Sequence, residues 1–420
     1  MQQHVVVIGL GYVGLPLARE AALAGLHVTG LDINQEITDS LNEGRSHIDD
    51  LADSDIAQMR EAGFSATIEP SCIADAEVAI ICVPTPLSPE GGPDLRAVIN
   101  AAETCASHLH SGLLVILEST TYPGTTDELL RPILETSGFQ AGEDFHLAFS
   151  PERIDPGNRT YGPKNTPKVI GGHTSTCAEI ASKFYQQFVD TTVPTRGTRE
   201  AEMSKLLENT YRHVNIALVN EIAKFCHELN IDLWDVIHAA SSKPFGFQAF
   251  YPGPGVGGHC IPIDPNYLSH NIKSTLGYPF RFVELAQEIN NRMPSYVVER
   301  AQDLLNDRSL PLKGSVILLL GVTYKANIAD QRESPATDIA ARLNTKGATV
   351  LYHDPYVLEW HGANFAERVD SPYLSTRESD LTILLQKHAE YDVDHLIAQS
   401  RCFFDTRGAS QGDVPHVHRL

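Results

Sequence analysis

The sequence predicts an α/β fold in which two Rossmann-like, doubly wound domains are joined by a long central helix or helical domain. Three observations lead to this expectation. Apolar runs alternate with helical patterns as far as about residue 195, one long amphipathic pattern follows, and the last third repeats the alternating plan. The 420 residues have room for two or three domains. We expect domains at residues 1–196, 197–308 and 309–420.

The first domain opens with a nucleotide-binding pattern. Five apolar runs predict parallel strands at residues 5–8, 26–31, 78–83, 113–117 and 145–149. The first run leads directly into G-x-G-x-x-G at Gly9, Gly11 and Gly14 and an expected helix over 15–24, and the second run ends at Asp32. Such glycines let a pyrophosphate approach the backbone, and such an acid suits a ribose hydroxyl but repels a 2′-phosphate. We therefore expect this domain to bind NAD rather than NADP.

The middle of the chain has helical periodicity. Residues 199–229 predict one long helix with apolar residues every three or four positions. A second helix is expected over 281–306, where Met293-Pro294 suggests a kink or a break. The last third predicts strand, helix and strand at residues 315–321, 335–344 and 349–353, with Asp354 at the final strand end. That is the plan of the first domain without its glycine pattern.

One thiol stands at the end of a glycine-rich loop. Gly and Pro make up five of the six residues 253–258, and Cys260 follows after His259. Downstream, Asp264-Pro265 predicts a helix N-cap with proline at the first helical position. A thiol near a helix start is biased toward the nucleophilic thiolate. The alternative is a buried cysteine beside a tight turn.

Composition narrows the class of protein. The seven cysteines form no C-x-x-C pair, which suits a reducing cytosol and argues against a structural metal. We expect no signal peptide, no membrane insertion and a cytoplasmic location. A net charge of −21 opposes nucleic acid and anionic membranes. An anionic substrate therefore needs a local cationic site, for which the candidates are Lys205, Lys325, Arg332 and Arg407.

The glycine pattern and the Cys260 loop together resemble the UDP-glucose/GDP-mannose dehydrogenase family. Further similar segments cover nearly the whole chain, at residues 83–86, 118–126, 150–153, 201–209, 321–325 and 330–335. The resemblance implies that two NAD molecules, one after the other, each accept one hydride from C6 of a nucleotide sugar. It also implies that a thiolate, here Cys260, holds the substrate first as a thiohemiacetal and then as a thioester.

The resemblance also implies roles for individual residues. Lys205 and Asn209 would stabilise negative charge on oxygen, Glu152 with Thr120 would direct water to the thioester, and Asp264 would assist the first proton transfer. The division of work between Glu152 and Asp264 stays open. So do plainer interpretations: a solvated lysine beside a capping asparagine, a surface glutamate and a simple helix cap. The implied NAD-binding residues are Gly9, Gly11, Tyr12, Val13, Gly14, Asp32, Thr85, Pro86, Thr120 and Arg332. The implied substrate-binding residues are Glu152, Arg153, Lys205, Asn209, Arg212, Tyr251, Gly253, Gly255, Gly257, Tyr324, Lys325 and Arg407.

The substrate is expected to be a UDP-sugar. Residues 150–158, 165–172 and 243–247 look like the branch of the family that acts on UDP-N-acetylhexosamines, above all UDP-N-acetylglucosamine, and the product would serve polysaccharide or cell-envelope synthesis. UDP-N-acetylmannosamine and UDP-glucose are the alternatives. A non-catalytic regulator is disfavoured because every catalytic residue is present. Ile37 departs from relatives that carry a basic residue there. We also expect a homodimer or higher homo-oligomer.

Overall fold

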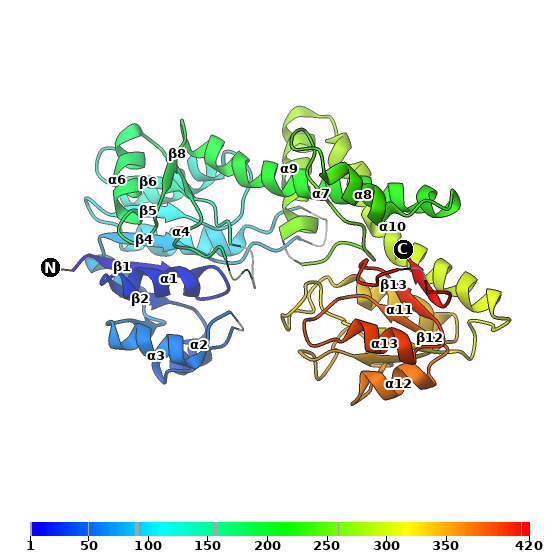
Figure 1. Ribbon diagram of the computed structural model, residues 1–420. Coiled ribbons are helices and arrows are strands. Elements are labelled where there is room, and N and C mark those ends of the chain that lie inside the picture. Colours follow the sequence, from blue (N-terminus) through cyan, green and yellow to red (C-terminus); the bar gives the residue numbers. More distant parts are fainter. Residues whose placement is uncertain are drawn as a thin grey trace. The chain divides into compact units, whose positions relative to one another are not determined.

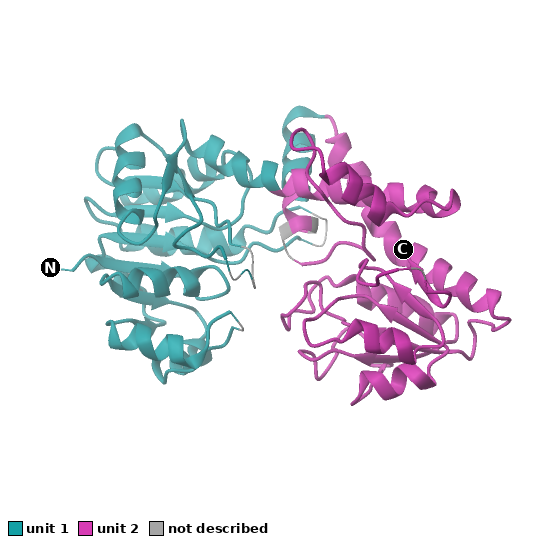
Figure 2. Ribbon diagram, in the orientation of Figure 1, with its two compact units in different colours: residues 1–208, 266–277 teal, residues 209–265, 278–420 magenta. Residues whose placement is uncertain are grey.

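The computed structural model describes residues 2–48, 50–88, 92–154, 158, 160–258, 260–412 and 414–420, without the side chains of Cys260 and Pro262 (Figure 1). The chain forms two compact units (Figure 2). Unit 1 comprises residues 1–208 and 266–277, and unit 2 comprises residues 209–265 and 278–420. Each unit contains one β-sheet flanked by helices, and a long helix connects them in the chain. The predicted fold class is confirmed.

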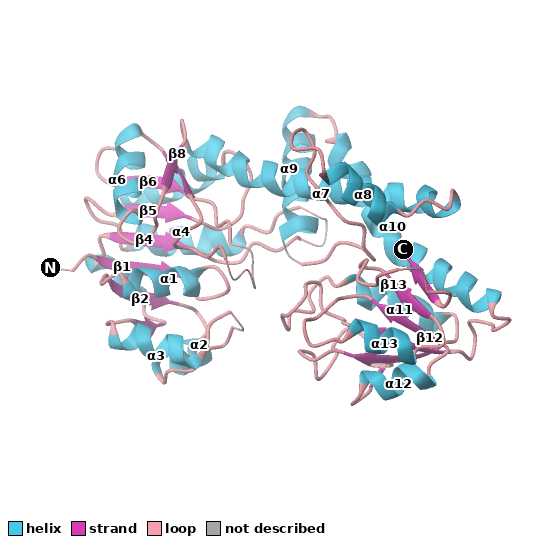
Figure 3. Ribbon diagram, in the orientation of Figure 1, coloured by secondary structure: helices cyan, strands magenta, loops and turns pink. Residues whose placement is uncertain are grey.

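Unit 1 contains a sheet in the order β3-β2-β1-β4-β5-β6-β7-β8, whose strands lie side by side in Figure 3. Neighbouring strands are parallel except for β6 and β7, which are antiparallel. The strands are β1 (His4–Ile8), β2 (His27–Leu31), β3 (Ser65–Thr67), β4 (Val78–Ile81), β5 (Leu114–Leu117), β6 (His146–Phe149), β7 (Lys168–Gly172) and β8 (Thr192–Pro194). The helices are α1 (Gly14–Leu23), α2 (Gln35–Asn42), α3 (Asp53–Glu61), α4 (Arg96–Ser107), α5 (Arg131–Leu134) and α6 (Ser175–Tyr185).

Both faces of this sheet are buried, as the continuous apolar runs require. Val5 and Val7 pack into one core with α1 and α6, whereas Val6 and Ile8 pack into another with α4. Successive strand residues point to opposite faces, so a strand covered on both sides must be apolar throughout. The five predicted strands are therefore confirmed, with ends that shift by one or two residues.

Unit 2 contains an entirely parallel sheet in the order β11-β10-β9-β12-β13-β14. Its strands are β9 (Val316–Leu320), β10 (Thr349–His353), β11 (Glu367–Arg368), β12 (Leu381–Leu384), β13 (Phe403–Asp405) and β14 (Val417–Arg419). Its shorter helices are α8 (Leu233–Ser241), α11 (Pro335–Thr345), α12 (Pro372–Glu378) and α13 (Val393–Gln399), and α10 (Arg281–Asp307) is long. Two helices belong to both units, α7 (Thr198–Glu228) and α9 (Cys260–Leu276).

The prediction that Asp264 caps a helix beginning at Pro265 is wrong. Helix α9 already begins at Cys260, so Asp264 and Pro265 lie inside it. The positive φ of 82° at Gly258 cannot belong to a helix, so α9 starts almost as soon as the glycine run ends. Pro265 then leaves the carbonyl of Ile261 without its helical N–H partner, a cost that the helix tolerates.

The long helices otherwise follow the sequence. Helix α7 matches its predicted span within one residue, and α10 continues through Pro294 without the break that the proline suggested. The apolar pattern of α7 is only partly buried, because Tyr211, Leu218 and Phe225 stay about half exposed, at 48%, 53% and 47%.

Candidate functional site

The glycine pattern and Asp32 form one hydrogen-bonded unit at the ends of β1 and β2. The Asp32 carboxylate accepts the Leu10 N–H at 2.9 Å and the Asn34 N–H at 3.0 Å. A Cβ atom at Gly14 would lie 1.9 Å from the carbonyl oxygen of Gly9, so only glycine fits there. Gly11 has open space where its Cβ would be, which leaves its backbone accessible to a ligand. These residues fit a dinucleotide.

The position of this turn in the sheet also favours a nucleotide. Chain order reverses between β1 and β4, and ligands of such sheets bind beyond the strand ends at that point. Thr85 and Pro86 follow β4, and the Thr85 carbonyl accepts a hydrogen bond from the Tyr267 hydroxyl. Tyr12, in the glycine turn, is 37% exposed.

Three predicted catalytic side chains of unit 1 come together. The Lys205 ammonium on α7 donates to the Thr120 hydroxyl at 2.6 Å and lies 3.8 Å from a Glu152 carboxylate oxygen. Thr120 follows β5 and Glu152 follows β6, so two strand ends and one helix supply the cluster. Burial raises the pKa of Glu152, although Lys205 and the Ile154 N–H oppose that shift. A buried carboxyl with a raised pKa beside a fixed cation suits proton transfer near neutral pH.

Glu202 supports this cluster, and the sequence analysis missed it. It lies three residues before Lys205 on α7, is fully buried, and accepts from the N–H groups of Gly124 (2.6 Å) and Thr126 (2.8 Å) and from the Thr126 hydroxyl (2.7 Å). It therefore ties the loop that carries Thr120 to the helix that carries Lys205. Burial raises the pKa of Glu202 to about 7. An acid one turn from a buried lysine was a detectable signal.

A buried ion pair lies beside Glu152. The Lys168 ammonium contacts Glu118 at 2.7 Å, and the Tyr185 hydroxyl donates to the same carboxylate. Glu118, Glu152 and Lys168 line one small pocket. Arg153, a predicted substrate-binding residue, pairs through its guanidinium with Glu208 at 2.7 Å and donates to the Pro167 carbonyl.

Unit 2 brings together two further predicted catalytic residues. The Asn209 amide donates to Asp264 at 2.6 Å, and Asp264 is 4% exposed. Asn209 lies one turn after Lys205 on α7, and Asp264 lies one turn after Cys260 on α9. The Cys260 side chain and all of His259 fall outside the described residues.

The glycine-rich loop is held by buried amides. The Gly253 N–H donates to Asn220 at 2.9 Å, and Asn220 donates to Asn290 at 2.9 Å. Asn220 is fully buried and Asn290 is 3% exposed. Neither residue was predicted, because the pairing joins positions far apart in the sequence.

This loop lies against the predicted substrate cations and their neighbours. A Cβ at Gly253 would lie 2.9 Å from the Arg407 guanidinium, and one at Gly257 would lie 2.7 Å from the Tyr324 Cβ. Burial lowers the pKa of Arg407 to about 10, against the opposing effect of Asp405. Its Nε donates to the Leu385 carbonyl at 2.6 Å. A desolvated cation beside bare backbone is suited to a diphosphate.

Three domains of one protein family match consecutive parts of the chain. The NAD binding domain of the UDP-glucose/GDP-mannose dehydrogenase family matches residues 3–189, its central domain matches residues 199–292, and its UDP binding domain matches residues 318–411. The chain belongs to this family. It is therefore an NAD-dependent UDP-sugar dehydrogenase by family, and NAD is its cofactor.

Individual relatives differ in their named substrates. UDP-N-acetyl-D-glucosamine 6-dehydrogenase of Salmonella typhi is 38% identical over 355 residues, which cover 84% of this chain and 82% of that protein. NDP-N-acetyl-D-galactosaminuronic acid dehydrogenase of Ralstonia nicotianae is 36% identical over 418 residues, or 96% and 95% of the two chains. The structure of UDP-D-ManNAc dehydrogenase from Pyrococcus horikoshii matches with a TM-score of 0.88 and 31% identity, covering 99% of both chains.

Arg332 and Arg212 are two further predicted binding residues of this family member. Arg332, assigned to the cofactor, belongs to unit 2, where its guanidinium pairs with Asp330 at 2.6 Å and its carbonyl accepts the Gly258 N–H at 3.3 Å. Arg212 is exposed on α7. Within the described part of the chain, no group of three or more His, Cys, Asp or Glu side chains is placed to hold a metal ion. Nor does that part contain a helix with the length and apolar character needed to cross a membrane.

Proposed function

We propose that this protein oxidises the C6 hydroxyl of UDP-N-acetylglucosamine to the carboxylate, with Cys260 as the covalent nucleophile, for polysaccharide or cell-envelope synthesis. The observation that carries the proposal is the buried cluster of Lys205, Thr120 and Glu152 in a chain with both NAD and UDP binding domains. We keep residues 1–196, 197–308 and 309–420 as the proposed NAD-binding, central and UDP-sugar-binding domains.

The proposed reaction has two oxidation steps and one hydrolysis, and Cys260 holds the substrate covalently between them. NAD, when bound, supplies the hydride acceptor, and two molecules are needed in succession because the conversion of alcohol to acid removes four electrons. The Cys260 thiolate adds to the C6 aldehyde and gives a thiohemiacetal. After the second oxidation a thioester remains, which water cleaves to the carboxylate and the free thiol.

Lys205 and Asn209 stabilise charge on the C6 oxygen. The Lys205 ammonium is held by Thr120 with little exposure, so it needs no reorganisation as an alkoxide develops. Glu152, with its raised pKa, accepts a proton from the water that attacks the thioester. Asp264, held by Asn209, assists the first proton transfer.

The UDP moiety is bound by unit 2. The net charge of the chain, −21, repels a diphosphate, so Arg407 and Lys325 supply the local positive charge that binds it. The glycine-rich loop contributes backbone beside Arg407 at Gly253. N-acetylglucosamine is favoured by the resemblance in residues 150–158, 165–172 and 243–247 and by the names of two relatives. Other relatives are named for N-acetylmannosamine and N-acetylgalactosaminuronic acid, so UDP-sugars with these epimeric configurations are the alternative substrates.

The deciding experiment counts NADH released per UDP-sugar consumed. We expect two NADH for each UDP-N-acetylglucosamine, and a kcat/KM for UDP-glucose that is lower by roughly tenfold to a few hundredfold, because buried groups that bond an acetamide lose their partner. Cys260→Ser should still bind NAD and UDP but fail to release the acid. Complete turnover by that variant would refute the covalent mechanism, and equal efficiency with UDP-glucose would refute the substrate assignment.

We also propose a homodimer that buries the exposed apolar stripe of α7. Tyr211, Leu218 and Phe225 recur at intervals of seven residues and are each about half exposed. Such a stripe is typical of a helix that packs on a second copy. Light scattering should give twice the mass of 46.0 kDa, and Leu218→Glu should give the monomer mass. A monomeric parent protein would contradict the proposal.

A further inference from the structure

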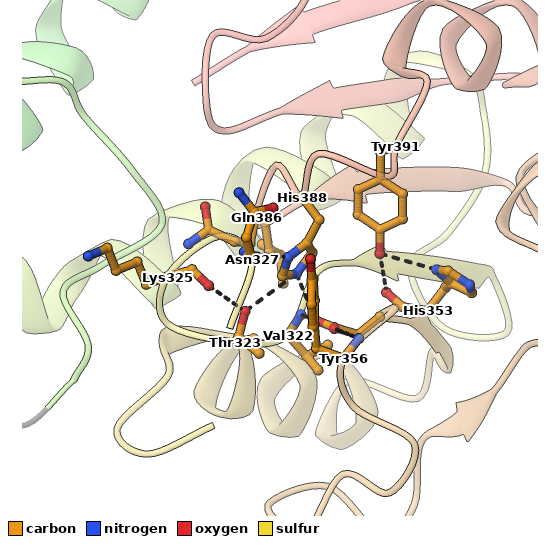
Figure 4. A network of polar contacts seen from close by, with 12 residues as sticks. Val322, Thr323, Lys325, Asn327, His353, Tyr356, Gln386, His388 and Tyr391 are labelled. Atoms are coloured by element: carbon orange, nitrogen blue, oxygen red, sulfur yellow. Dashed lines mark hydrogen bonds and ion pairs between the residues drawn. The ribbon is translucent and has the colours of Figure 1, made fainter. Parts of the chain in front are cut away.

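The second sheet carries a buried polar network at the ends of β9, β10 and β12 (Figure 4). Asp354 follows β10 and His388 lies four residues after β12, and both side chains are fully buried. Asp354 accepts the Val322 N–H at 2.7 Å, the Tyr356 N–H at 2.8 Å and the His388 ring at 3.0 Å. A fully satisfied network of this kind fixes the conformation of the backbone it contacts.

The ring contacts of His388 define its tautomer. Its Nδ1 accepts the Asn327 N–H at 2.9 Å, so in the neutral ring the proton is on Nε2, which donates to Asp354. The same Nε2 lies 3.4 Å from the Thr323 hydroxyl, and that hydroxyl donates to the Lys325 carbonyl at 2.8 Å. One imidazole thus contacts both ends of the turn at residues 323–327.

The far end of this turn is held twice. Asn327 adopts a left-handed conformation with φ of 64°, and its side-chain oxygen accepts the Ala389 N–H at 2.7 Å. In the middle of the turn, the Gln386 amide donates to the Tyr324 carbonyl at 3.0 Å. The segment that follows β12 therefore fixes the backbone on both sides of Lys325, whose ammonium points away from the network in Figure 4.

We propose that His388 is a positioning residue for the nucleoside diphosphate of the substrate, and that it acts through Lys325. By holding residues 323 and 327, it fixes the backbone from which the Lys325 side chain projects, so that less binding energy is spent on ordering this turn when the diphosphate binds. The inference rests on the proposed role of Lys325 as a diphosphate contact.

The test is a double-mutant cycle on the full chain, with UDP binding measured by calorimetry. We expect His388→Ala to weaken UDP binding by about tenfold in the parent protein and by less than about twofold in a Lys325→Ala background, because a residue that acts through Lys325 has little left to position. NAD affinity should stay unchanged in every variant. His395→Ala, which removes an exposed histidine from α13, is the control and should leave both affinities unchanged.

A second variant, at an exposed residue of the same turn, tests the proposal if His388→Ala does not fold. Asn327→Gly keeps the left-handed backbone accessible but removes the contact to Ala389, and Asn327 is exposed. It should weaken UDP binding in the same direction, by less, and again only when Lys325 is present. Equal losses with and without Lys325, or no loss, would overturn the role of His388 alone. A parent protein that does not bind UDP would instead overturn the proposed function.

Discussion

The strand ends that carry Asp32 and Asp354 have the same backbone hydrogen bonds but differ in the exposure and the side-chain partner of the aspartate. In unit 1 the Gly9 N–H donates to the Leu31 carbonyl at 2.8 Å, and the next N–H bonds Asp32. In unit 2 the Gly321 N–H donates to the His353 carbonyl at 2.9 Å, and the next N–H bonds Asp354. Asp32 remains partly exposed, whereas Asp354 is fully buried against His388.

The partner of the acid decides what the strand end can do. An exposed carboxylate beside bare glycine backbone can accept a ribose hydroxyl. A fully buried carboxylate bonded to histidine is not accessible to a ligand, and instead it helps to fix a turn that carries the side chains of Tyr324 and Lys325. Helix α1 begins directly after the first turn, whereas α11 begins only at Pro335, which leaves room for those side chains. Under the proposed function, the first strand end would meet a dinucleotide with backbone N–H groups, and the second would meet the UDP group with side chains.

We propose that both strand ends bind ligands and that the chemistry depends on Lys205 of helix α7, so the largest effect on catalysis is expected at Lys205. Lys205→Ala should lower kcat by about 10²–10³ while changing KM for the UDP-sugar much less, because the charge that it stabilises develops in the transition state. Steady-state kinetics with saturating NAD measure this. The matched variant Lys325→Ala should raise KM and leave kcat nearly unchanged. A change in KM alone at Lys205 would make it a binding residue.

Much of the fold, and part of the candidate site, could be predicted from the sequence. The five strands of unit 1, the glycine turn and the length of α7 follow from local patterns that the structure reproduces within one or two residues. The start of α9 was mispredicted because proline is compatible with both the first turn and, at a cost, the interior of a helix. Three apolar positions of α7 remain exposed because periodicity does not say what covers a face.

The supporting residues could not be predicted because their partners are remote in sequence. Glu202 bonds residues 76 and 78 positions away, Asn220 bonds Gly253, and His388 bonds Asp354 and Asn327. No local pattern identifies these remote partners. For Glu202, the available indication was its position one helical turn before the predicted site lysine, Lys205.

Two buried carboxyl groups, Asp354 and Glu202, have pKa values shifted in opposite directions, so their contributions to stability should respond to pH in opposite directions. Despite burial, His388 and the backbone donors lower the pKa of Asp354, whereas burial raises that of Glu202 from 4.5 to about 7. The folded state therefore binds the Glu202 proton more tightly than the unfolded chain. Its contribution to stability is full below pH 4.5, falls as pH rises, and is gone above about 7.

Glu202→Gln should remove that dependence. The stability of the parent protein relative to the variant should fall by an amount on the order of 3 kcal/mol between pH 4.5 and 7.5, and stay flat above that range. Melting temperatures of both proteins at half-unit pH steps measure the difference, and because both proteins share every other titrating group, those groups cancel. A constant gap across this range would show that Glu202 does not titrate there.

The smallest expected effects separate the two strand ends directly. Asp32→Asn and Asp354→Asn are isosteric, and each removes one charge from the same place in the backbone scaffold. Asp32→Asn should raise KM for NAD by about tenfold, the size expected for one weakened hydrogen bond to a charged group, and leave UDP affinity unchanged. Asp354→Asn should weaken UDP binding and leave NAD affinity unchanged.

The reason for the second effect lies in the histidine. Facing an amide NH₂, the His388 ring can accept only if its proton moves to Nδ1, and Nδ1 then opposes the Asn327 N–H donor. In that orientation the turn around Lys325 loses one anchor. With the amide oxygen toward His388 instead, the NH₂ group faces the Tyr356 N–H donor, so the network loses a hydrogen bond in either orientation. Melting temperature serves as the control, since Asp354→Asn disturbs a buried pair and should lower it more than Asp32→Asn does. If each variant weakened the binding of NAD and of UDP equally, the two strand ends would not act independently. The contrast between the partly exposed Asp32 and the fully buried Asp354 would then not explain why one binds NAD and the other supports UDP binding.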